Sequence, residues 1–445
     1  MDLRNYGFFD IKHDKFMKAN TPYTVYAELL DETAQAQFLD VISNPFVTYG
    51  ALMPDAHAGY TMPIGGVCST KGYIVPQFVG FDIGCGMCAY QTDYFKEDIE
   101  DKRDDIYQKI IESIPLGFHK HKREQKFHTD APHTSFARHI LNTVGLKQLG
   151  SLGGGNHFIE VGYGKDNKVW IIIHSGSRGL GHKIGTHYML KAYALQNPTD
   201  GKLEAIIKDF EDRNVVFKEK NPQGYEKALT KFSDKQRVAL DKKKNVDNIK
   251  GIWGFDVNSD MGKDYIDDQN FALEYALANR KHMLERVFNI LNDTLGGDDN
   301  INYDNEERFI NRNHNHAEFD KTKGEWIHRK GATHAEKGMR GVIPANMRDG
   351  CFIVMGKGNP KSLNSSSHGA GRVMSRKKAN STISMEDFTN SMKGITGTVD
   401  ENTIDESPFA YKDIYEVLEL QKDLIDVLDH IKVLINVKDN SKGKY

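Results

Sequence analysis

The chain has 445 residues, of which 39% are hydrophobic and 27% are charged, a composition typical of a soluble globular protein. No stretch approaches the roughly 18 apolar residues that a membrane span needs, and residues 1–18 lack a signal-peptide pattern, so we expect a cytoplasmic protein without membrane contact. A formal net charge of −3 excludes nucleic-acid binding through overall basic charge, and four cysteines in so long a chain do not make a disulfide framework.

Residues 51–90 are short apolar runs broken by glycines, which predicts short strands joined by tight turns. The first turn carries Asp55 and His57, which we expect to lie behind a site. The run FDIGCGMC then places Asp82 and Cys85 three residues apart between glycines. A carboxylate and a thiolate together suit a divalent transition metal better than Ca²⁺ or Mg²⁺. The missing ligands should be imidazoles, and the candidates are His57, His157, His174, His314 and His368, each within two residues of Gly, Asn or Ser.

Residues 100–150 are typical of polar helices, and the next two runs are typical of strands. The first strand begins after His157, and the second, KVWIII, ends at His174. A turn between the two runs predicts a hairpin. The histidines at its two outer ends are then neighbours and can meet one ion.

Residues 200–245 are rich in Lys and Glu and predict an insertion-like layer of helices. From Asp268 to Leu295 the apolar residues follow a 3.6-residue period, so this segment is the clearest helix of the chain. Asn279 and Arg280 interrupt its apolar stripe, which makes them candidates for contact with phosphate or RNA.

Strand-like runs follow at 325–330 and 351–355, and residues 364–376 are the most polar stretch of small residues. We expect a helix near Lys412 to His430 and a short strand that ends at Lys438. No repeat, linker or change of composition divides the chain. We therefore predict one mixed α/β (α+β) domain over residues 1–445, with central sheets, peripheral helices and a helical insertion-like layer at about 200–295.

Three basic segments are candidates for local contact with nucleic acid: His119 to Lys126, Lys242 to Lys244, and the group of Arg372, Arg376, Lys377 and Lys378. Charge runs in a soluble protein are more often solvated faces. We give weight to the last group only, because it follows a Gly-rich segment that carries its own histidine.

The candidate ligands gain weight jointly, because each is flanked by turn residues and together they suffice for two adjacent ions if Cys85 bridges them. The set is Asp82, Cys85, His157, His174 and His314. Two adjacent ions are a recurring solution for in-line displacement at phosphorus. A competing interpretation makes Cys85 and Cys88 a redox pair or part of a zinc knuckle, but the chain lacks a second close Cys or His pair, and Gly84 and Gly86 disfavour a helix there.

His368 differs from the other histidines because serines precede it and Gly369-Ala370-Gly371 follows it. Loops of this kind offer backbone donors to phosphates, and Arg372 could contact a phosphate too. A neutral imidazole in this position can attack phosphorus and form a phosphoramidate. The alternatives are a metal ligand or an ordinary loop histidine.

These residues resemble the RtcB family of RNA-splicing ligases over nearly the whole chain. The resemblance rests on PDAHAG (54–59), VGFDIGCGM (79–87), GGGNHFIE (153–160), HSGSRGLG (174–181), HN (314–315), SHGAGRVMSR (367–376), AYKD (410–413) and the terminal VK (437–438). It implies an unusual α/β fold, two Mn²⁺ ions, GTP, and the joining of RNA 3′-phosphate or 2′,3′-cyclic phosphate ends to 5′-hydroxyl ends, in tRNA splicing or RNA repair.

By position, the five candidate ligands match the family's metal ligands, and His368 matches the histidine that takes GMP from GTP. The matching nucleotide pocket is Asn156, Phe158, Glu160, Asn315, Pro344, Ala345, Asn346, Met347, Cys351, Gly369, Ala370, Gly371 and Lys438. Candidate contacts to RNA or phosphate are Arg178, Asn279, Arg280, Arg372 and Arg376. We expect a monomer, and the sequence does not decide whether an activating protein partner is required.

Two departures from the family pattern concern the nucleotide pocket: PANM (344–347) stands where PGSM is common, and Cys351 stands where serine is common. Cys88 is an extra thiol near the cluster. Zn²⁺ should outbind Mn²⁺ at a site with thiolate and imidazole ligands, so metal supply must decide occupancy. The alternative functions are a metal-dependent RNA 2′,3′-cyclic phosphodiesterase without ligation, and an RNA-binding or metal-storage protein with a vestigial site.

Overall fold

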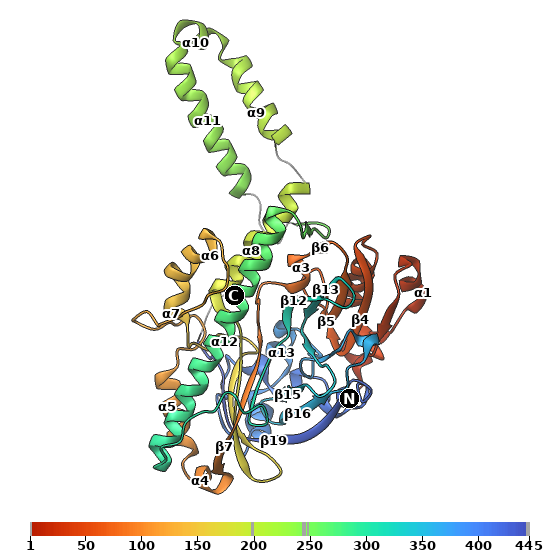
Figure 1. Cartoon of the computed structure of the whole chain (residues 1–445), viewed down its shortest axis with the longest axis vertical. Coiled ribbons are helices and arrows are strands. Elements are labelled where there is room, and N and C mark those ends of the chain that lie inside the picture. The colour runs from red at the N-terminus through yellow and green to blue at the C-terminus, as the bar shows by residue number, and fades with distance from the viewer. Residues whose placement is uncertain (1, 197–199, 243–245, 247–248, 442–445) are drawn as a thin grey trace.

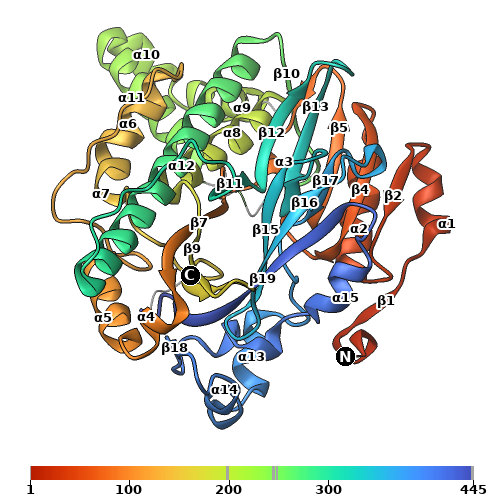
Figure 2. The same ribbon diagram turned by 60° about the horizontal axis from the view of Figure 1, so that its bottom comes forward.

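The computed structural model describes residues 2–196, 200–242, 246 and 249–441, with backbone alone at 200–204, 234 and 237–242. It has the predicted mixed α/β (α+β) class, built around two large sheets (Figures 1 and 2). The larger sheet has the strand order β11-β7-β9-β8-β19-β16-β15, and the smaller has the order β12-β13-β5-β4-β2. No described helix is both long enough and apolar enough to cross a membrane.

The strands of the larger sheet are β7 (Gly86–Phe95), β8 (Phe158–Tyr163), β9 (Lys168–Ser175), β11 (Phe309–Asn313), β15 (Arg340–Asn346), β16 (Gly350–Gly356) and β19 (Ile425–Val437). The short β18 (Thr396–Gly397) pairs with β19 off this path. The strands of the smaller sheet are β2 (Tyr23–Val25), β4 (Val47–His57), β5 (Ile64–Thr70), β12 (Asn315–Asp320) and β13 (Glu325–Lys330). His314 connects the two sheets. It lies between β11, an edge strand of the larger sheet, and β12, an edge strand of the smaller sheet.

The longest helix, α12 (Asp260–Leu295), packs on the larger sheet (Figure 2). Ser259 caps its start by accepting a hydrogen bond from Gly262 N, so the helix begins eight residues before the predicted start at Asp268. Its Met283 and Val287 share an apolar cluster with Ile171 and Ile173 of β9. This cluster holds the sheet that carries most of the candidate site.

The interval 200–295 contains two kinds of helix. Helices α9 (Asp200–Arg213), α10 (Val215–Lys220) and α11 (Pro222–Lys242) form a helical arm that projects from the rest of the molecule (Figure 1). Phe210 and Phe232 stack between its two long helices, with ring centroids 4.3 Å apart. Helix α12, by contrast, belongs to the core.

The other helices surround the sheets. They include α2 (Glu32–Ile42), α5 (Arg103–Ser113), α6 (Ser135–Ile140), α7 (Leu146–Gln148), α8 (Arg178–Gln196), α13 (Arg376–Thr382), α14 (Met385–Ser391) and α15 (Ile414–Glu419).

The prediction of a helix near Lys412 to His430 is wrong for its second half. Only α15 is helical, and β19 begins at Ile425. The segment IDVLDHIKVLINV is strand because it pairs with β16 on one side and β8 on the other. This central position buries five of its six β-branched side chains, all except Val427, and an extended strand suits such side chains better than a helix does.

Candidate active site

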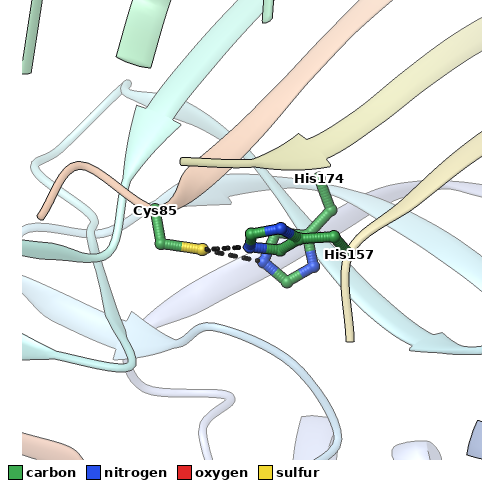
Figure 3. Close-up of side chains that lie close together, drawn as sticks. All are labelled: Cys85, His157 and His174. Atoms are coloured by element: carbon green, nitrogen blue, oxygen red, sulfur yellow. Dashed lines mark hydrogen bonds between the residues drawn. The ribbon is translucent and has the colours of Figure 1, made fainter. Parts of the chain in front are cut away.

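Three neighbouring strands of the larger sheet bring the first candidate ligands together. Cys85 directly precedes β7, His157 directly precedes β8, and His174 lies in β9, between these two strands in the sheet (Figure 3). In the ladder, His174 is opposite Phe158 on one side and Met87 on the other. The predicted hairpin of β8 and β9 is therefore confirmed, with its two histidines at the same end.

The ligand atoms of these residues converge. Cys85 Sγ lies 3.3 Å from His157 Nε2 and 3.3 Å from His174 Nε2. His174 Nε2 lies 3.3 Å from His314 Nε2, and His157 Nε2 lies 3.0 Å from Asp82 Oδ2. The five predicted ligands thus form one continuous chain of close contacts.

A hydrogen bond outside the cluster orients the ring of His157 so that its Nε2 lone pair faces the other ligands. His157 Nδ1 lies 3.1 Å from Leu152 O, so Nδ1 carries the proton that this carbonyl accepts, which leaves Nε2 toward Asp82 and Cys85. Burial first, and neighbouring positive groups next, lower the pKa values of His174 and His314 well below the ordinary value, which favours neutral imidazoles. Neutral imidazole is the form that binds a metal.

The donor set fits a divalent transition metal. Cys85, His157 and His174 are buried, and their ligand atoms all lie within 4.8 Å of one another. Burial opposes ionisation of Asp82, but its hydrogen bond and charge interaction with His157 lower the pKa of this carboxyl. A carboxylate, a sulfur and imidazole lone pairs that face each other in a buried cluster are stabilised together by a cation among them. A bound cation would also favour the thiolate of Cys85, whose pKa burial and Asp82 raise.

Asn279 and Arg280 are fully buried, and neither lines the cavity described below. Their side chains instead bond to backbone segments next to the site. Arg280 Nη1 donates to Gly84 O at 2.7 Å and to Ser175 O at 2.9 Å, which links the loop before Cys85 to the end of β9. Asn279 Oδ1 accepts from the backbone amides of Gly150 and Ser151. Both side chains are fully buried, and their predicted contact with RNA or phosphate stays a prediction.

His368 lies beside the metal cluster, with its ring centroid 4.9 Å from that of His314. Its Nδ1 lies 2.7 Å from Oδ2 of Asp55, which has no exposed surface and also accepts from the amides of His368 and Gly369. The carboxylate holds the Nδ1 proton, so the lone pair is on Nε2. Gly371 has φ +78°, and a Cβ there would lie 2.3 Å from the backbone oxygen of Asp55, so position 371 must be glycine where the loop passes the backbone of Asp55.

A cavity of about 290 Å³ joins the metal cluster to His368 and to the predicted nucleotide residues. Asp82, Cys85, His174, His314 and His368 reach it, together with Asn156, Phe158, Glu160, Asn315, Pro344, Ala345, Asn346, Met347, Gly369, Ala370, Gly371, Arg372, Arg376 and Lys438. Cys351 does not line it, and its thiol is buried beside Glu160. Among the predicted RNA contacts, Arg178 also lies outside the lining and donates to Gly117 O and Ser151 Oγ.

Glu160 lies in the wall of this cavity as a buried carboxyl group. Burial raises its pKa to about 8 against the opposing effects of neighbouring Cys351, Asn436 and Lys438. Its Oε1 has no hydrogen-bond partner among the described residues, and Asn436 Nδ2 donates to Oε2 at 3.2 Å. An unpartnered buried carboxyl oxygen at a cavity wall suits a ligand that brings N–H donors.

Glu406 organises the cations at the other end of the cavity, and the sequence analysis missed it. Lys438 Nζ lies 3.0 Å from its Oε2, and Arg376 Nη1 lies 2.6 Å from its Oε1. Arg372 and Tyr411 also bond to this carboxylate. Burial opposes ionisation, but the three cations outweigh it and hold the pKa of Glu406 well below its ordinary range. The motif AYKD at 410–413 was the only nearby signal in the sequence.

Comparison with known proteins agrees with this arrangement. A family model described as tRNA-splicing ligase RtcB matches residues 37–140 and 129–439. The chain is 32% identical over 413 residues to the RNA-splicing ligase RtcB of Escherichia coli strain K12, covering 88% of this chain and 90% of that protein. It is 28% identical over 482 residues to the tRNA-splicing ligase RtcB of Methanococcus maripaludis, covering 90% of each chain. The chain therefore belongs to the RtcB family.

Proposed function

We propose that this RtcB-family RNA ligase joins RNA 3′-phosphate or 2′,3′-cyclic phosphate ends to 5′-hydroxyl ends, with GTP as the energy source. The observation that carries the proposal is the position of His368. Its Nδ1 is held by Asp55, and its ring lies next to the ligand cluster in one cavity with the nucleotide residues. A neutral imidazole with its lone pair on Nε2 is prepared to attack phosphorus.

Metal binding in this proposal uses Asp82, Cys85, His157, His174 and His314, with two Mn²⁺ ions as the expected occupants. Bound divalent cations would supply positive charge against the phosphate oxygens. The contribution of the chain is to present neutral imidazoles and a sulfur at fixed positions in a buried cluster.

The reaction follows in four steps. His368 Nε2 attacks the α-phosphorus of GTP, pyrophosphate leaves, and a histidine–GMP phosphoramidate forms. Water opens a cyclic phosphate, where one is present, to a 3′-phosphate and a 2′-hydroxyl. The 3′-phosphate oxygen attacks the phosphoramidate, which frees His368 and gives an RNA-3′-pp-5′-G end. The 5′-hydroxyl of the second RNA then attacks the 3′-phosphorus, the phosphodiester bond forms, and GMP leaves. The covalent step divides one difficult displacement into easier ones.

The acidic wall of the cavity supports guanine as the base. The Watson–Crick edge of guanine carries two kinds of N–H donor, and the unpartnered Oε1 of Glu160 is an acceptor in the cavity wall. Lys438 supplies a donor nearby, and its ammonium group is paired with Glu406.

Asn346, at one departure from the family pattern, bonds to Asp349 and caps the turn between β15 and β16.

The test compares two reactions on one RNA that ends in a 2′,3′-cyclic phosphate, with a 5′-hydroxyl RNA as partner, with and without GTP. We expect a joined product only with GTP and Mn²⁺, and none with the His368→Ala variant, which should keep its bound metal. Hydrolysis of the cyclic end without GTP, and no joined product in any condition, would instead identify a cyclic phosphodiesterase. RNA binding without either reaction would indicate a vestigial site.

A further inference from the structure

The basic loop, residues 117–128, is a charged segment that the proposed chemistry does not use. It carries four Lys or Arg residues and one Glu, within a chain whose net charge is −3. Lys120, Lys122, Arg123 and Lys126 are all exposed, and no helix or strand contains them. Phe118 is 63% exposed at the start of the loop. Of the other two basic segments, the first has Arg372 and Arg376 engaged with Glu406 and Asp405, and Lys378 over the ring of Tyr6. In the second, Lys243 and Lys244 lie outside the described residues.

The start of the loop is bonded to the residues that position His157. Leu152 N donates to Pro115 O at 3.0 Å, and Gly117 N donates to Gly153 O at 3.2 Å. Leu152 O is the acceptor of the His157 Nδ1 proton and also accepts from Ser175 Oγ at 2.7 Å. One residue, Leu152, therefore bonds both to the segment that opens the basic loop and to a metal ligand.

The same point of the loop also meets the nucleotide end of the site. Gly117 has φ +59°, and a Cβ there would lie 2.3 Å from Oδ2 of Asp439, the residue after Lys438. Arg178 Nη2 donates to Gly117 O at 2.6 Å. The loop thus begins next to Asp439, which follows Lys438, and next to the segment that precedes His157.

Farther along, backbone bonds hold the loop against the protein and leave its cations outside. His121 N donates to Lys147 O at 2.9 Å, and Gln125 N donates to Leu146 O at 2.8 Å. His121 Nε2 lies 3.1 Å from Gly150 O. Backbone bonds therefore hold the loop along α7, and its exposed cations have fixed positions on the surface.

We propose that the basic loop is the docking surface for the phosphate backbone of single-stranded RNA, next to the end that reacts. This inference rests on the proposed function, because it assumes that an RNA end enters the cavity. A row of cations complements successive phosphates of a single strand. Glu124 is the single carboxylate of the loop and does not cancel the excess of positive charge.

The test neutralises the loop cations and compares an equal change elsewhere. The loop variant carries Lys120→Gln, Lys122→Gln, Arg123→Gln and Lys126→Gln. The control variant carries Lys208→Gln, Lys220→Gln, Lys227→Gln and Lys231→Gln, which are exposed on the helical arm. Both variants have the same net charge, so a difference between them reports position and not overall charge.

Two readouts separate docking from chemistry. The first is the affinity for a 3′-phosphorylated single-stranded RNA, measured by fluorescence anisotropy over a series of salt concentrations. We expect the loop variant to bind about 10- to 100-fold more weakly, with the slope of log affinity against log salt reduced by about 3, as loss of four phosphate contacts predicts. The second is formation of the GMP adduct from GTP without RNA, which should be unchanged. The control variant should match the parent in both readouts.

Equal loss of RNA affinity in both variants, or unchanged affinity in the loop variant, would overturn the proposal. Loss of the GMP adduct in the loop variant would overturn it too, because the loop would then act on the chemistry. Failure of the proposed function has a different signature: the parent protein forms no adduct, whereas its RNA affinity still depends on the loop.

Discussion

The metal end and the nucleotide end of the cavity differ in the charges that surround their buried groups. At the metal end, the buried ligand atoms of Cys85, His157 and His174 converge on one another, and no lysine or arginine among the described residues is seen to bond to them. At the nucleotide end, Glu406 is already surrounded by Arg372, Arg376 and Lys438. An added cation would stabilise the metal end, whereas the nucleotide end sets three cations against Glu406 and Asp405 and keeps an excess of positive charge for an anionic ligand.

Removing the sulfur at the metal end should have the largest effect. Cys85→Ala deletes the atom that lies 3.3 Å from both His157 and His174, so we expect loss of bound metal, of GMP adduct and of ligation. Cys88→Ala is the matched control, because Cys88 lies in the apolar cluster with Tyr90 and Ile173. Metal content by elemental analysis checks this expectation, and equal metal in the two variants would contradict the ligand role of Cys85.

Neutralising the carboxylate at the nucleotide end should act on stability. Glu406→Gln leaves buried cations without their counter-charge, which we expect to lower the free energy of unfolding by about 3–5 kcal/mol at pH 7. Because the pKa of Glu406 is held below the ordinary value of 4.5, its contribution is present above that pH and is lost as pH falls further. Urea unfolding at pH 7 and in acid measures both effects. A parent protein that loses no more stability in acid than the variant would argue against them.

A smaller effect is expected where the two ends meet, at the carboxylate behind His368. Asp55→Asn keeps the size of the side chain but removes the charge beside Nδ1, so we expect GMP-adduct formation to slow by about 10- to 100-fold. Metal content and GTP affinity should not change. Single-turnover kinetics with labelled GTP provide the rate, and a parent-like rate would show that Asp55 does not orient or polarise the imidazole.

The smallest expected effect is a pH dependence of GTP binding. The pKa of Glu160 is raised to about 8, so this group is mostly protonated at pH 6 and ionises as pH rises toward 8. Because the N–H donors of guanine favour the carboxylate, GTP affinity should increase by about 3- to 10-fold from pH 6 to pH 8. Glu160→Gln should flatten this profile. Calorimetric titration measures it, and parallel profiles in the two proteins would remove Glu160 from base recognition.

The metal end could be predicted from the sequence because its residues are tied to local patterns. His157 and His174 border two strand-like runs separated by one turn, and the hairpin register then places Phe158 opposite His174. Cys85 and Asp82 lie between glycines before a strand. Such local patterns depend on a few neighbouring residues. The pairing of β7 with β9 in the sheet then brings the loop before β7 next to the end of β9.

The nucleotide end could not be predicted to the same degree. Glu406 lies in a segment of short 3-10 turns without periodicity, and its partners come from residues 372–438, so only the tertiary fold assembles them. Arg280 shows a different limit of sequence patterns. A polar interruption of an apolar stripe predicts a contact with phosphate or RNA, and the same residue donates to the backbone carbonyls of Gly84 and Ser175, which no local pattern could indicate.

The most direct test of the account is the intact mass of the protein after incubation with GTP and Mn²⁺, followed by peptide mapping. We expect a GMP-sized adduct on the peptide that contains His368, stable in alkali and lost in acid, as a phosphoramidate should be. The adduct should be absent in His368→Ala, with bound metal retained. An adduct on another residue, or none on a protein shown to hold metal, would contradict the assignment of His368 as the nucleophile.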